Sequence, residues 1–469
     1  MLVGAECPGD SLPLAGRARE EILARYRRIR SFSALHPSDF ANPLLGPPSK
    51  GEEEEGALCQ TELILDIPSL LTSAAVRERA HRLLDLGSQG KLEHFGVDLS
   101  RLPAVADYVI DTMQSAYPDG DIPFHSRWRH FEAGGIDRWG GLVDAAGITD
   151  PMVFGRAAYD LAILSVLLDA GAGPDWKYVE AATGETFVRS EGLAVASFAM
   201  FASGLFSADP ADPLRADASA LAALGTEELA EGFQVGPDNP IVGLEGRVKL
   251  LNALGLAVAD RPDIFGEDEA RPGGLFDTVV GRAVDGKVAA PVVLELVLEG
   301  LGPIWPSRLV VDGVSLGDTW RHGKLVTDDA TSGLMPFHKL SQWLTYSLLE
   351  PLIWTGIEVV DLDGLTGLPE YRNGGLFIDF GVLAPKDPNA FLKVWKAGDE
   401  FIVEWRALTV ALLDRTAELI RARLGLDANS LPLAKVLEGG TWAAGRRIAR
   451  EKRVGGGPPL RLESDGTVF

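Results

Sequence analysis

Apolar residues recur at every third or fourth position over long stretches of the chain, which is the period of an amphipathic α-helix. Most of these stretches close at a Gly or a Pro, as helices commonly do. Alternation of apolar and polar positions is much rarer. The pattern therefore predicts a mainly α fold with small β elaborations. Helices are expected at residues 19–30, 69–87, 105–117, 154–171 and 239–259.

Two segments are predicted to form strands. Around Val310 to Leu316 the apolar positions alternate, and Asp312 followed by Gly is a typical turn between two paired strands. We therefore expect a short hairpin there. The segment from Gly374 to Leu383 is predicted to be one more strand.

Charged groups lie within otherwise apolar sequence in three blocks between Pro336 and Arg406. Burial of an unpaired charge is costly, so such groups are either mutually paired or kept for chemistry. In the first block, a helix over residues 337–349 would align Lys339, Gln342 and Tyr346 beside an apolar stripe. A cation, an amide and a phenol in a row suit a phosphate or a polyol. A solvated helix face is the simpler interpretation of the same pattern.

The second block, DLDGLTGLPEYRNGG, is too rich in Gly and Pro for a helix, so we expect a loop. It carries Asp361, Asp363 and Glu370, and Tyr371 and Arg372 follow directly. Carboxylates on a loop between rigid elements are typical of glycosidic cleavage, where one stabilises the developing positive charge and others bind hydroxyls or water. Turn formation explains Asp363 better, whereas the run from Glu370 to Arg372 favours a functional role.

The third block predicts a buried helix over residues 401–413, in which Glu404 and Arg406 are the only charges. Two positions apart, they point to different sides of a helix and cannot easily pair with each other. Arg372 and Glu370 are the expected partners. The result is either a structural ion-pair network or the wall of a pocket.

Other candidates are less specific. The segment HSRWRHFEAGGIDRW, which starts at His125, and the segment around Asp318, DTWRHGK, mix basic and aromatic residues. Both could bind an anion, although such a cluster more often forms a packed contact. Trp176, in PDWKY, offers an aromatic wall. No Ser-His-Asp or Cys-His arrangement can be argued from the sequence, which disfavours nucleophilic acyl chemistry.

Composition narrows the class of partner. The 469 residues carry 44 Lys and Arg against 67 Asp and Glu, a net charge of −23. Binding to nucleic acid or to anionic membranes needs a basic surface, so neither is expected. The two cysteines, Cys7 and Cys59, make no metal-ligand spacing and no disulfide framework, and the first residues lack the features of a signal peptide. We expect a cytoplasmic protein in which Gly192 to Ala208 forms a packed core helix.

Six strings of the chain are specific when taken together: SRWRHFEAGG, WPSRLVVDG, PFHKLSQWLTYSLLEPL, GLPEYRNGGLFID, EWRALTVALLDR and EGGTWAAGRRIA. Through them almost the whole chain resembles an uncharacterised-domain family that accompanies the fungal and bacterial URC route of uracil catabolism. In that route the ring of a uracil nucleotide is opened to give a urea attached to ribose.

The chain also resembles, more distantly, the queuosine-salvage nucleoside hydrolases, which are helical proteins similar to DNA glycosylases. The order and approximate spacing agree from about residue 160 to residue 425. Glu370 stands where those hydrolases have Asp, and the segment after Arg372 departs from theirs. The positions that match their motifs are Asp318, Phe337, His338, Lys339, Gln342, Asp361, Leu365, Thr366, Glu370, Tyr371, Arg372, Glu404 and Arg406.

The two resemblances together imply an N-glycosidic hydrolase that releases urea from ribosylurea or its 5′-phosphate without a metal or an organic cofactor. They imply Glu370, Asp361 and Glu404 as catalytic carboxylates. Substrate binding would fall to Lys339, Gln342, Tyr371, Arg372, Arg406, Trp176 and Asp318. Action on an earlier ring-opened nucleotide, or non-catalytic nucleotide binding, remains an alternative. Three consecutive regions are expected: a bracing helical region at 1–150, a DNA-glycosylase-like core with the site at 151–430, and an extension at 431–469.

Overall fold

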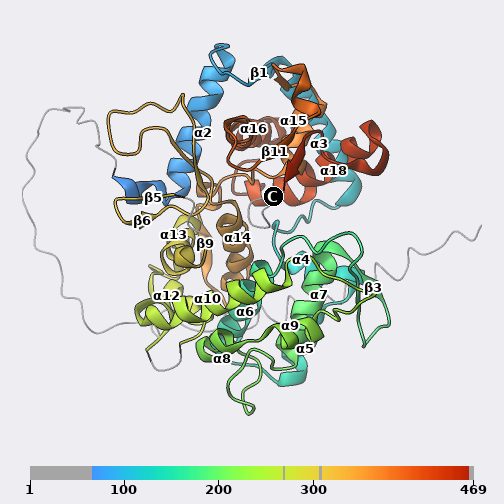
Figure 1. Cartoon of the computed structure of the whole chain (residues 1–469), viewed down its shortest axis with the longest axis vertical. Helices are drawn as coiled ribbons and strands as arrows, with labels where there is room; N and C mark the ends of the chain where they lie inside the picture. The colour runs from blue at the N-terminus through green and yellow to red at the C-terminus, as the bar shows by residue number, and fades with distance from the viewer. Residues whose placement is uncertain (1–65, 268–269, 306–308, 464–469) are drawn as a thin grey trace, which may run out of the picture. The chain divides into compact units, whose positions relative to one another are not determined.

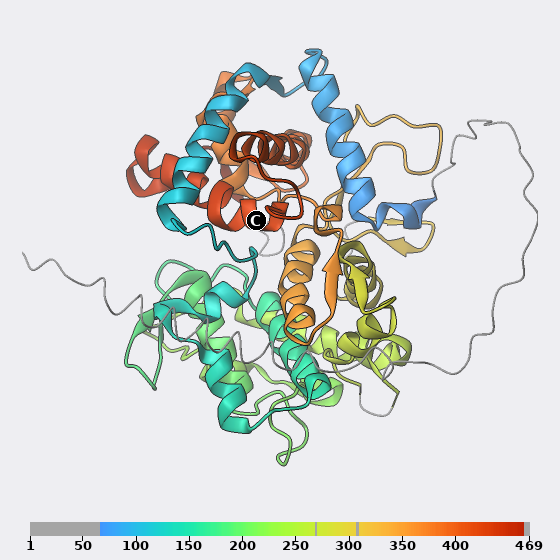
Figure 2. The ribbon, with the colours of Figure 1, turned by 180° about the vertical axis from the view of Figure 1, so that it is seen from behind.

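The computed structural model describes residues 66–267, 270–305 and 309–463. Over these residues the protein is mainly α, as the sequence predicted, and each of its sheets has only two strands (Figure 1; Figure 2). The helix predicted at residues 19–30 and both cysteines lie outside the described residues. No described helix has both the length and the apolar character needed to cross a membrane.

Contacts divide the chain into two compact units, each built from segments that are far apart in sequence. Among the described residues, the first unit contains 126–282 and 346–358, and the second contains 66–125, 283–345 and 359–463. This grouping differs from the three consecutive regions expected from the sequence.

The first unit is a set of helices around α6, which is buried along nearly its whole length. Phe276 packs so closely on Gly155 of α6 that a Cβ there would lie 2.2 Å from the ring. The core helix predicted over Gly192 to Ala208 is confirmed as far as Ala202, where the largely buried α7 ends; the residues from Ser203 to Ala208 lie outside it. The elements of this unit are α4 (Trp128–Phe131), α5 (Arg138–Ala146), α6 (Pro151–Leu167), β2 (Tyr178–Val179), β3 (Thr186–Phe187), α7 (Arg189–Ala202), α8 (Ala218–Ala223), α9 (Thr226–Gly232), α10 (Leu244–Asp260), α11 (Pro262–Phe265) and α12 (Gly274–Gly281).

The second unit is built on the long helix α16, which packs between α2 and α3 (Figure 1; Figure 2). The turn between Ala116 and His125 leads from α3 to the end of this unit's first segment. Its elements are α2 (Ser73–Ser88), β1 (Phe95–Val97), α3 (Leu102–Ala116), β4 (Lys287–Ala289), α13 (Ala290–Leu301), β5 (Val310–Val311), β6 (Val314–Ser315), β7 (Thr319–Arg321), β8 (Leu334–Pro336), α15 (Tyr371–Asp379), β10 (Leu383–Pro385), β11 (Val394–Lys396), α16 (Glu400–Leu424), α17 (Leu433–Val436), α18 (Trp442–Lys452) and β12 (Arg461–Glu463).

Two elements cross the boundary between these residue ranges. Helix α14 (Lys339–Trp354) begins among the residues of the second unit and ends among those of the first, and β9 (Glu358–Val360) follows it. The predicted helix at 337–349 thus begins two residues later than expected. Gln342 and Tyr346 are both fully buried, so the solvated-face interpretation of this helix was wrong for them.

The hairpin prediction was confirmed, whereas the second predicted strand was wrong. β5 and β6 pair antiparallel, and Asp312 and Gly313 both have positive φ in the turn between them. The segment predicted as a strand from Gly374 instead forms most of α15, and only its last residue, Leu383, begins a strand. The physical reason is the start of α15, where the Glu370 side chain satisfies two backbone N–H groups of the first turn.

Candidate active site

The second unit buries an ion pair between Asp318 and Arg406. The two nitrogens of the Arg406 guanidinium lie 2.9 and 2.8 Å from the two carboxylate oxygens of Asp318. Asp318 also accepts the indole N–H of Trp320 (2.7 Å) and the backbone N–H of Lys339 (3.1 Å). Burial acts to raise the pKa of Asp318, but Arg406 and the other donors outweigh it and hold the pKa below its ordinary value. Asp318 is therefore a saturated carboxylate that fixes the start of α14.

Arg406 and Gln342 together hold the segment that leads to Glu370. Arg406 packs its guanidinium 4.0 Å from the centre of the Phe337 ring, and its Nε lies 3.5 Å from the carbonyl oxygen of Pro369. Gln342 donates to the hydroxyl of Thr366 (2.6 Å) and accepts the Thr366 backbone N–H (2.8 Å). These contacts fix both ends of the short segment between Thr366 and Pro369.

Glu404 is fully buried in α16 and holds the strand β1 in place. One carboxylate oxygen accepts the backbone N–H groups of His94 (3.1 Å) and Phe95 (2.8 Å). The other oxygen lies 3.2 Å from Nε2 of His322. The Lys324 N–H donates to Nδ1 of that ring (3.2 Å), so Nε2 carries the hydrogen that His322 donates to Glu404. Both oxygens of Glu404 therefore have donors.

The predicted partners of the third block were wrong. The sequence suggested Arg372 and Glu370 for the buried charges of α16. The structure instead pairs Arg406 with Asp318, and it pairs Glu404 with His322 and two backbone N–H groups. We call Asp318, Gln342, Glu404 and Arg406 the frame, because each bonds to another part of the second unit and all four are buried or nearly so.

Glu370 occupies the N-cap position of α15. Its carboxylate oxygens accept the backbone N–H groups of Arg372 (2.7 Å) and Asn373 (2.6 Å). The positive end of the helix dipole favours a negative charge at this position. The residue is only 9% exposed, and burial raises the pKa of the Glu370 carboxyl above its ordinary value. The two N–H donors and the charges of Lys339 and His125 oppose that rise.

The side chains next to Glu370 are half-buried rather than sealed. Arg372 lies over the ring of Tyr371, 4.8 Å from its centre, and donates to the carbonyl oxygen of Gly456 (3.1 Å). Tyr371, Arg372 and Lys339 are all of intermediate exposure. An aromatic ring and one cation thus lie at the accessible edge of the start of α15, and the charge of Lys339, at the start of α14, also acts on Glu370.

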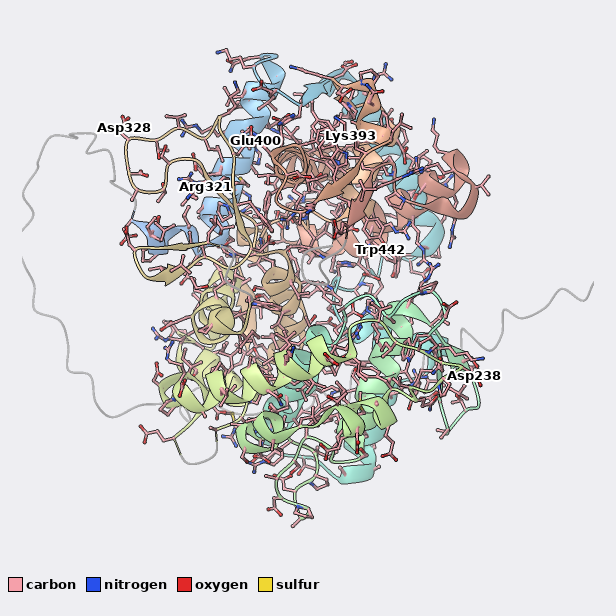
Figure 3. The ribbon with its side chains drawn as sticks, viewed as in Figure 1. Asp238, Arg321, Asp328, Lys393, Glu400 and Trp442 are labelled. Carbon is pink, nitrogen blue, oxygen red and sulfur yellow. The ribbon has the colours of Figure 1, made fainter. Side chains whose placement is uncertain are left out.

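The sequence did not predict a second pair of titratable side chains, His125 and Glu438, of which His125 acts on the Glu370 carboxyl through its charge. Nδ1 of His125 lies 2.6 Å from a carboxylate oxygen of Glu438. The ring of His125 is 6.1 Å from that of Trp442, centre to centre, and the guanidinium of Arg446 lies over the indole at 5.2 Å. Trp442 begins α18 and is labelled in Figure 3.

Glu438 lies in a π-helical turn, Leu437–Thr441, between α17 and α18. Such turns insert an extra residue into a helix and are frequent at functional sites. Its two glycines contact α3 and the segment after it: a Cβ on Gly439 would lie 2.9 Å from Ile122, and one on Gly440 would lie 2.6 Å from Val109. The sequence signal for this turn is therefore the pair of glycines directly after Glu438.

Two predicted site residues have other surroundings. Asp361 is exposed, has a positive φ of 51°, and carries its side chain over Gly364 at the start of a short 3-10 turn, Leu362–Gly364. Trp176 belongs to the first unit, where its ring is buried against Phe233 and its indole N–H donates to the Phe233 carbonyl oxygen (2.9 Å). Asp363 accepts the Leu433 N–H (2.7 Å) and pairs with Arg421, in keeping with the turn interpretation.

The basic and aromatic residues after His125 are packed within the first unit. The Arg127 guanidinium is fully buried and lies 2.8 Å from Asp169, and the indole N–H of Trp128 donates to the Ser347 carbonyl oxygen (2.7 Å). The packed-contact interpretation of this segment therefore describes Arg127 and Trp128 better than anion binding does.

Comparison with known proteins covers nearly the whole described chain. Residues 69–469 match a family described as "Protein of unknown function (DUF1688)". The chain is 41% identical over 412 residues to "Protein urg3" of Schizosaccharomyces pombe, covering 86% of this chain and 99% of that protein. It is 40% identical over 431 residues to "Uracil catabolism protein 4" of Lachancea kluyveri, covering 84% of this chain and 97% of that protein. The chain therefore belongs to the DUF1688 family.

Proposed function

We propose that this protein acts in uracil catabolism as an N-glycosidic hydrolase that cleaves ribosylurea, or its 5′-phosphate, to urea and ribose or ribose 5-phosphate. The name of the Lachancea kluyveri relative supports the pathway, and the resemblance to nucleoside hydrolases supports the reaction. The single observation that carries the proposal is Glu370: a buried carboxyl with raised pKa at a helix start, beside half-buried cations and an aromatic ring.

Cleavage of the bond between C1′ and nitrogen develops positive charge on the ribose ring. A carboxylate held in advance by two backbone N–H groups needs no reorganisation to face that charge or to take a proton from the attacking water. Glu370 has this arrangement. Its ionised form is the one the reaction uses, so activity rises as pH increases through its raised pKa.

The other matched residues divide into two roles. Lys339, Tyr371 and Arg372, all half-buried, contact the substrate, and the two cations bind its 5′-phosphate when it carries one. The frame residues act through position: Arg406 and Gln342 fix the segment before Glu370, Asp318 fixes Arg406, and Glu404 anchors β1. In this proposal Glu404 and Asp318 do not contact the ribose.

Urea release from ribosylurea 5′-phosphate, with ribosylurea alongside, tests the proposal directly. We expect urea from wild-type protein and a loss of kcat of about 10³-fold or more for Glu370→Gln, as for removal of a principal electrostatic group. The matched control is Asp361→Asn, because Asp361 is an exposed carboxyl of the same block. Equal losses in both variants, or none in Glu370→Gln, would reject the role of Glu370. A selective preference for the phosphorylated substrate would show that the cations read phosphate.

A non-catalytic nucleotide-binding protein is the second candidate. The saturation of Asp318 and Glu404 favours it, because two of the matched carboxylates are occupied by structural contacts. That function predicts a raised melting temperature with ligand and no urea. Product analysis with the earlier ring-opened nucleotides would show whether turnover occurs at a different step of the route.

A further inference from the structure

The His125–Glu438 pair joins two segments that are more than 300 residues apart in sequence. Neither residue has a role in the hydrolysis described above. The imidazole Nδ1 lies 2.6 Å from a Glu438 oxygen, and the His125 backbone N–H donates to the carbonyl oxygen of Ala434 (3.1 Å). Trp442 packs beside the ring. The ring therefore has two contacts and the backbone of His125 a third, all with the stretch from α17 to α18.

Because Glu438 contacts Nδ1, the other ring nitrogen of His125, Nε2, can exchange a proton with a ligand. A carboxylate at Nδ1 orients an imidazole so that its Nε2 faces the reacting group. Among the residues that the structure describes, no hydrogen bond to Nε2 of His125 is formed. The side chains of His125 and Glu438 are 11% and 18% exposed, so they are neither sealed in the core nor freely solvated.

Close backbone packing brings this pair to the start of α15. A Cβ on Gly445 of α18 would lie 2.2 Å from the carbonyl oxygen of Arg372, so α18 packs directly on the first turn of α15. Figure 1 shows the two helices side by side. Glu370 caps that same turn, and the effect of the His125 charge on the Glu370 carboxyl agrees with this proximity.

We propose that His125 is the catalytic acid that protonates the leaving urea, and that Glu438 is the positioning residue that orients it. This inference rests on the proposed hydrolysis. The bond between C1′ and the urea nitrogen breaks, its electron pair stays on nitrogen, and the proton on His125 Nε2 transfers to that nitrogen. Water forms the new bond to C1′ and gives a proton to the Glu370 carboxylate. Proton return from Glu370 to His125 through solvent completes the cycle.

The assignment follows from the chemistry of the leaving group. An unprotonated urea anion is a very poor leaving group, so a proton donor is needed beside the carboxylate that faces C1′. The charged and titratable groups near the imidazole are Glu438 at Nδ1, Glu370 on the α15 side, and Arg446 over Trp442, and Lys339 acts on Glu370 from the start of α14. His125 is the group near Glu370 whose second ring nitrogen, Nε2, makes no hydrogen bond among the described residues, so this nitrogen can carry the proton that the leaving group takes.

Leaving-group dependence tests the acid role. We expect His125→Gln to lower kcat for urea release by about 10²- to 10⁴-fold. The same variant should hydrolyse 4-nitrophenyl β-D-ribofuranoside within a few fold of wild type, because nitrophenolate leaves without protonation. Glu370→Gln should lose both activities. Equal loss of both activities in His125→Gln, or wild-type urea release, would overturn the acid role.

The pH profile gives a readout that does not depend on the nitrophenyl substrate. In wild type, kcat for urea release should fall at high pH as the acid loses its proton, and this limb should be absent in His125→Gln. Retention of the limb would overturn the assignment. If wild type releases no urea from either ribosylurea, the proposed function itself fails. If wild type releases urea and His125→Gln releases it at the same rate, only the acid role of His125 is rejected and the proposed hydrolysis stands.

Variants of Glu438 distinguish a positioning role from a role in packing alone. Glu438→Gln should reduce kcat with little change in KM and shift the high-pH limb, and Glu438→Asp should recover part of the loss. A matched control is His81→Gln, since His81 pairs with Asp414 at 2.8 Å in the same unit and is not part of the proposed site. Parallel effects of Glu438→Gln and His81→Gln on kcat would show a merely structural role.

Discussion

Two sets of carboxylates in the second unit differ in how completely their oxygens are bonded. In the frame, Asp318 accepts four N–H groups and Glu404 accepts three. At the start of α15, Glu370 accepts two backbone N–H groups and lies near half-buried cations, and Glu438 has a histidine partner and partial exposure. A saturated carboxylate can hold structure but has little capacity left for a substrate. The carboxylates of the frame therefore stabilise the fold, whereas Glu370 and Glu438 have the capacity to take part in a reaction.

The largest expected effect on stability comes from breaking the frame at Arg406. Arg406→Met removes the bidentate partner and leaves Asp318 buried and unpaired, so the free energy of unfolding should fall by about 3–5 kcal/mol. Denaturant unfolding of the full chain measures this loss. The control is Arg415→Met, which removes an exposed ion pair with Glu418 and should cost less than about 1 kcal/mol. Similar losses in the two variants would contradict the idea of a frame.

A smaller loss is expected at Glu404. Glu404→Gln keeps the size of the side chain but turns an amide NH₂ toward donors, either His322 or the N–H groups of His94 and Phe95. Leaving buried donors unsatisfied should cost about 1–3 kcal/mol. Unfolding of Glu400→Gln serves as the comparison, because Glu400 is on the same helix with a side chain that is 41% exposed. Loss of urea release at wild-type stability would instead assign Glu404 to the substrate.

Sequence patterns located the buried charges but not their partners. The helix predicted over residues 401–413 lies within α16, and the scarcity of charge in that segment correctly predicted that Glu404 and Arg406 are buried. Their partners His322 and Asp318 lie 82 and 88 residues earlier in the chain. Local periodicity holds no information on which distant segment packs on a helix. The partner assignment therefore required the tertiary structure.

The start of α15 shows a second limit of prediction from the sequence. Ser, Thr, Asp and Asn are the usual N-cap residues, and Glu370 followed by two glycines gave no clear helix signal. The same run of residues then resembled a strand. The His125–Glu438 pair was invisible for a further reason, since 313 residues separate its members. Glu438 begins one of the strings that carry the resemblance and His125 directly precedes another, yet only packing reveals that the two residues meet.

The smallest expected effect concerns the stability of Glu370→Gln and its dependence on pH. Glutamine keeps one oxygen for the N–H groups of α15, so the free energy of unfolding should change by no more than about 1 kcal/mol. The sign with pH follows from the raised pKa of Glu370. Below the ordinary carboxyl pKa the residue is protonated in both the folded and the unfolded state, and its contribution is greatest. As pH rises through the raised pKa, the folded state must ionise a buried group and that contribution is lost.

Wild type should therefore be more stable relative to Glu370→Gln at pH 4 than at pH 7, which urea unfolding at the two pH values measures. Asp361→Asn provides the comparison, because Asp361 is exposed and outside the α15 cap. A difference that grows toward pH 7 would mean that the cap and the neighbouring cations dominate over burial. Glu370 would then be a structural carboxylate like those of the frame. Only Glu438 and His125 would remain as candidates for a role in the reaction.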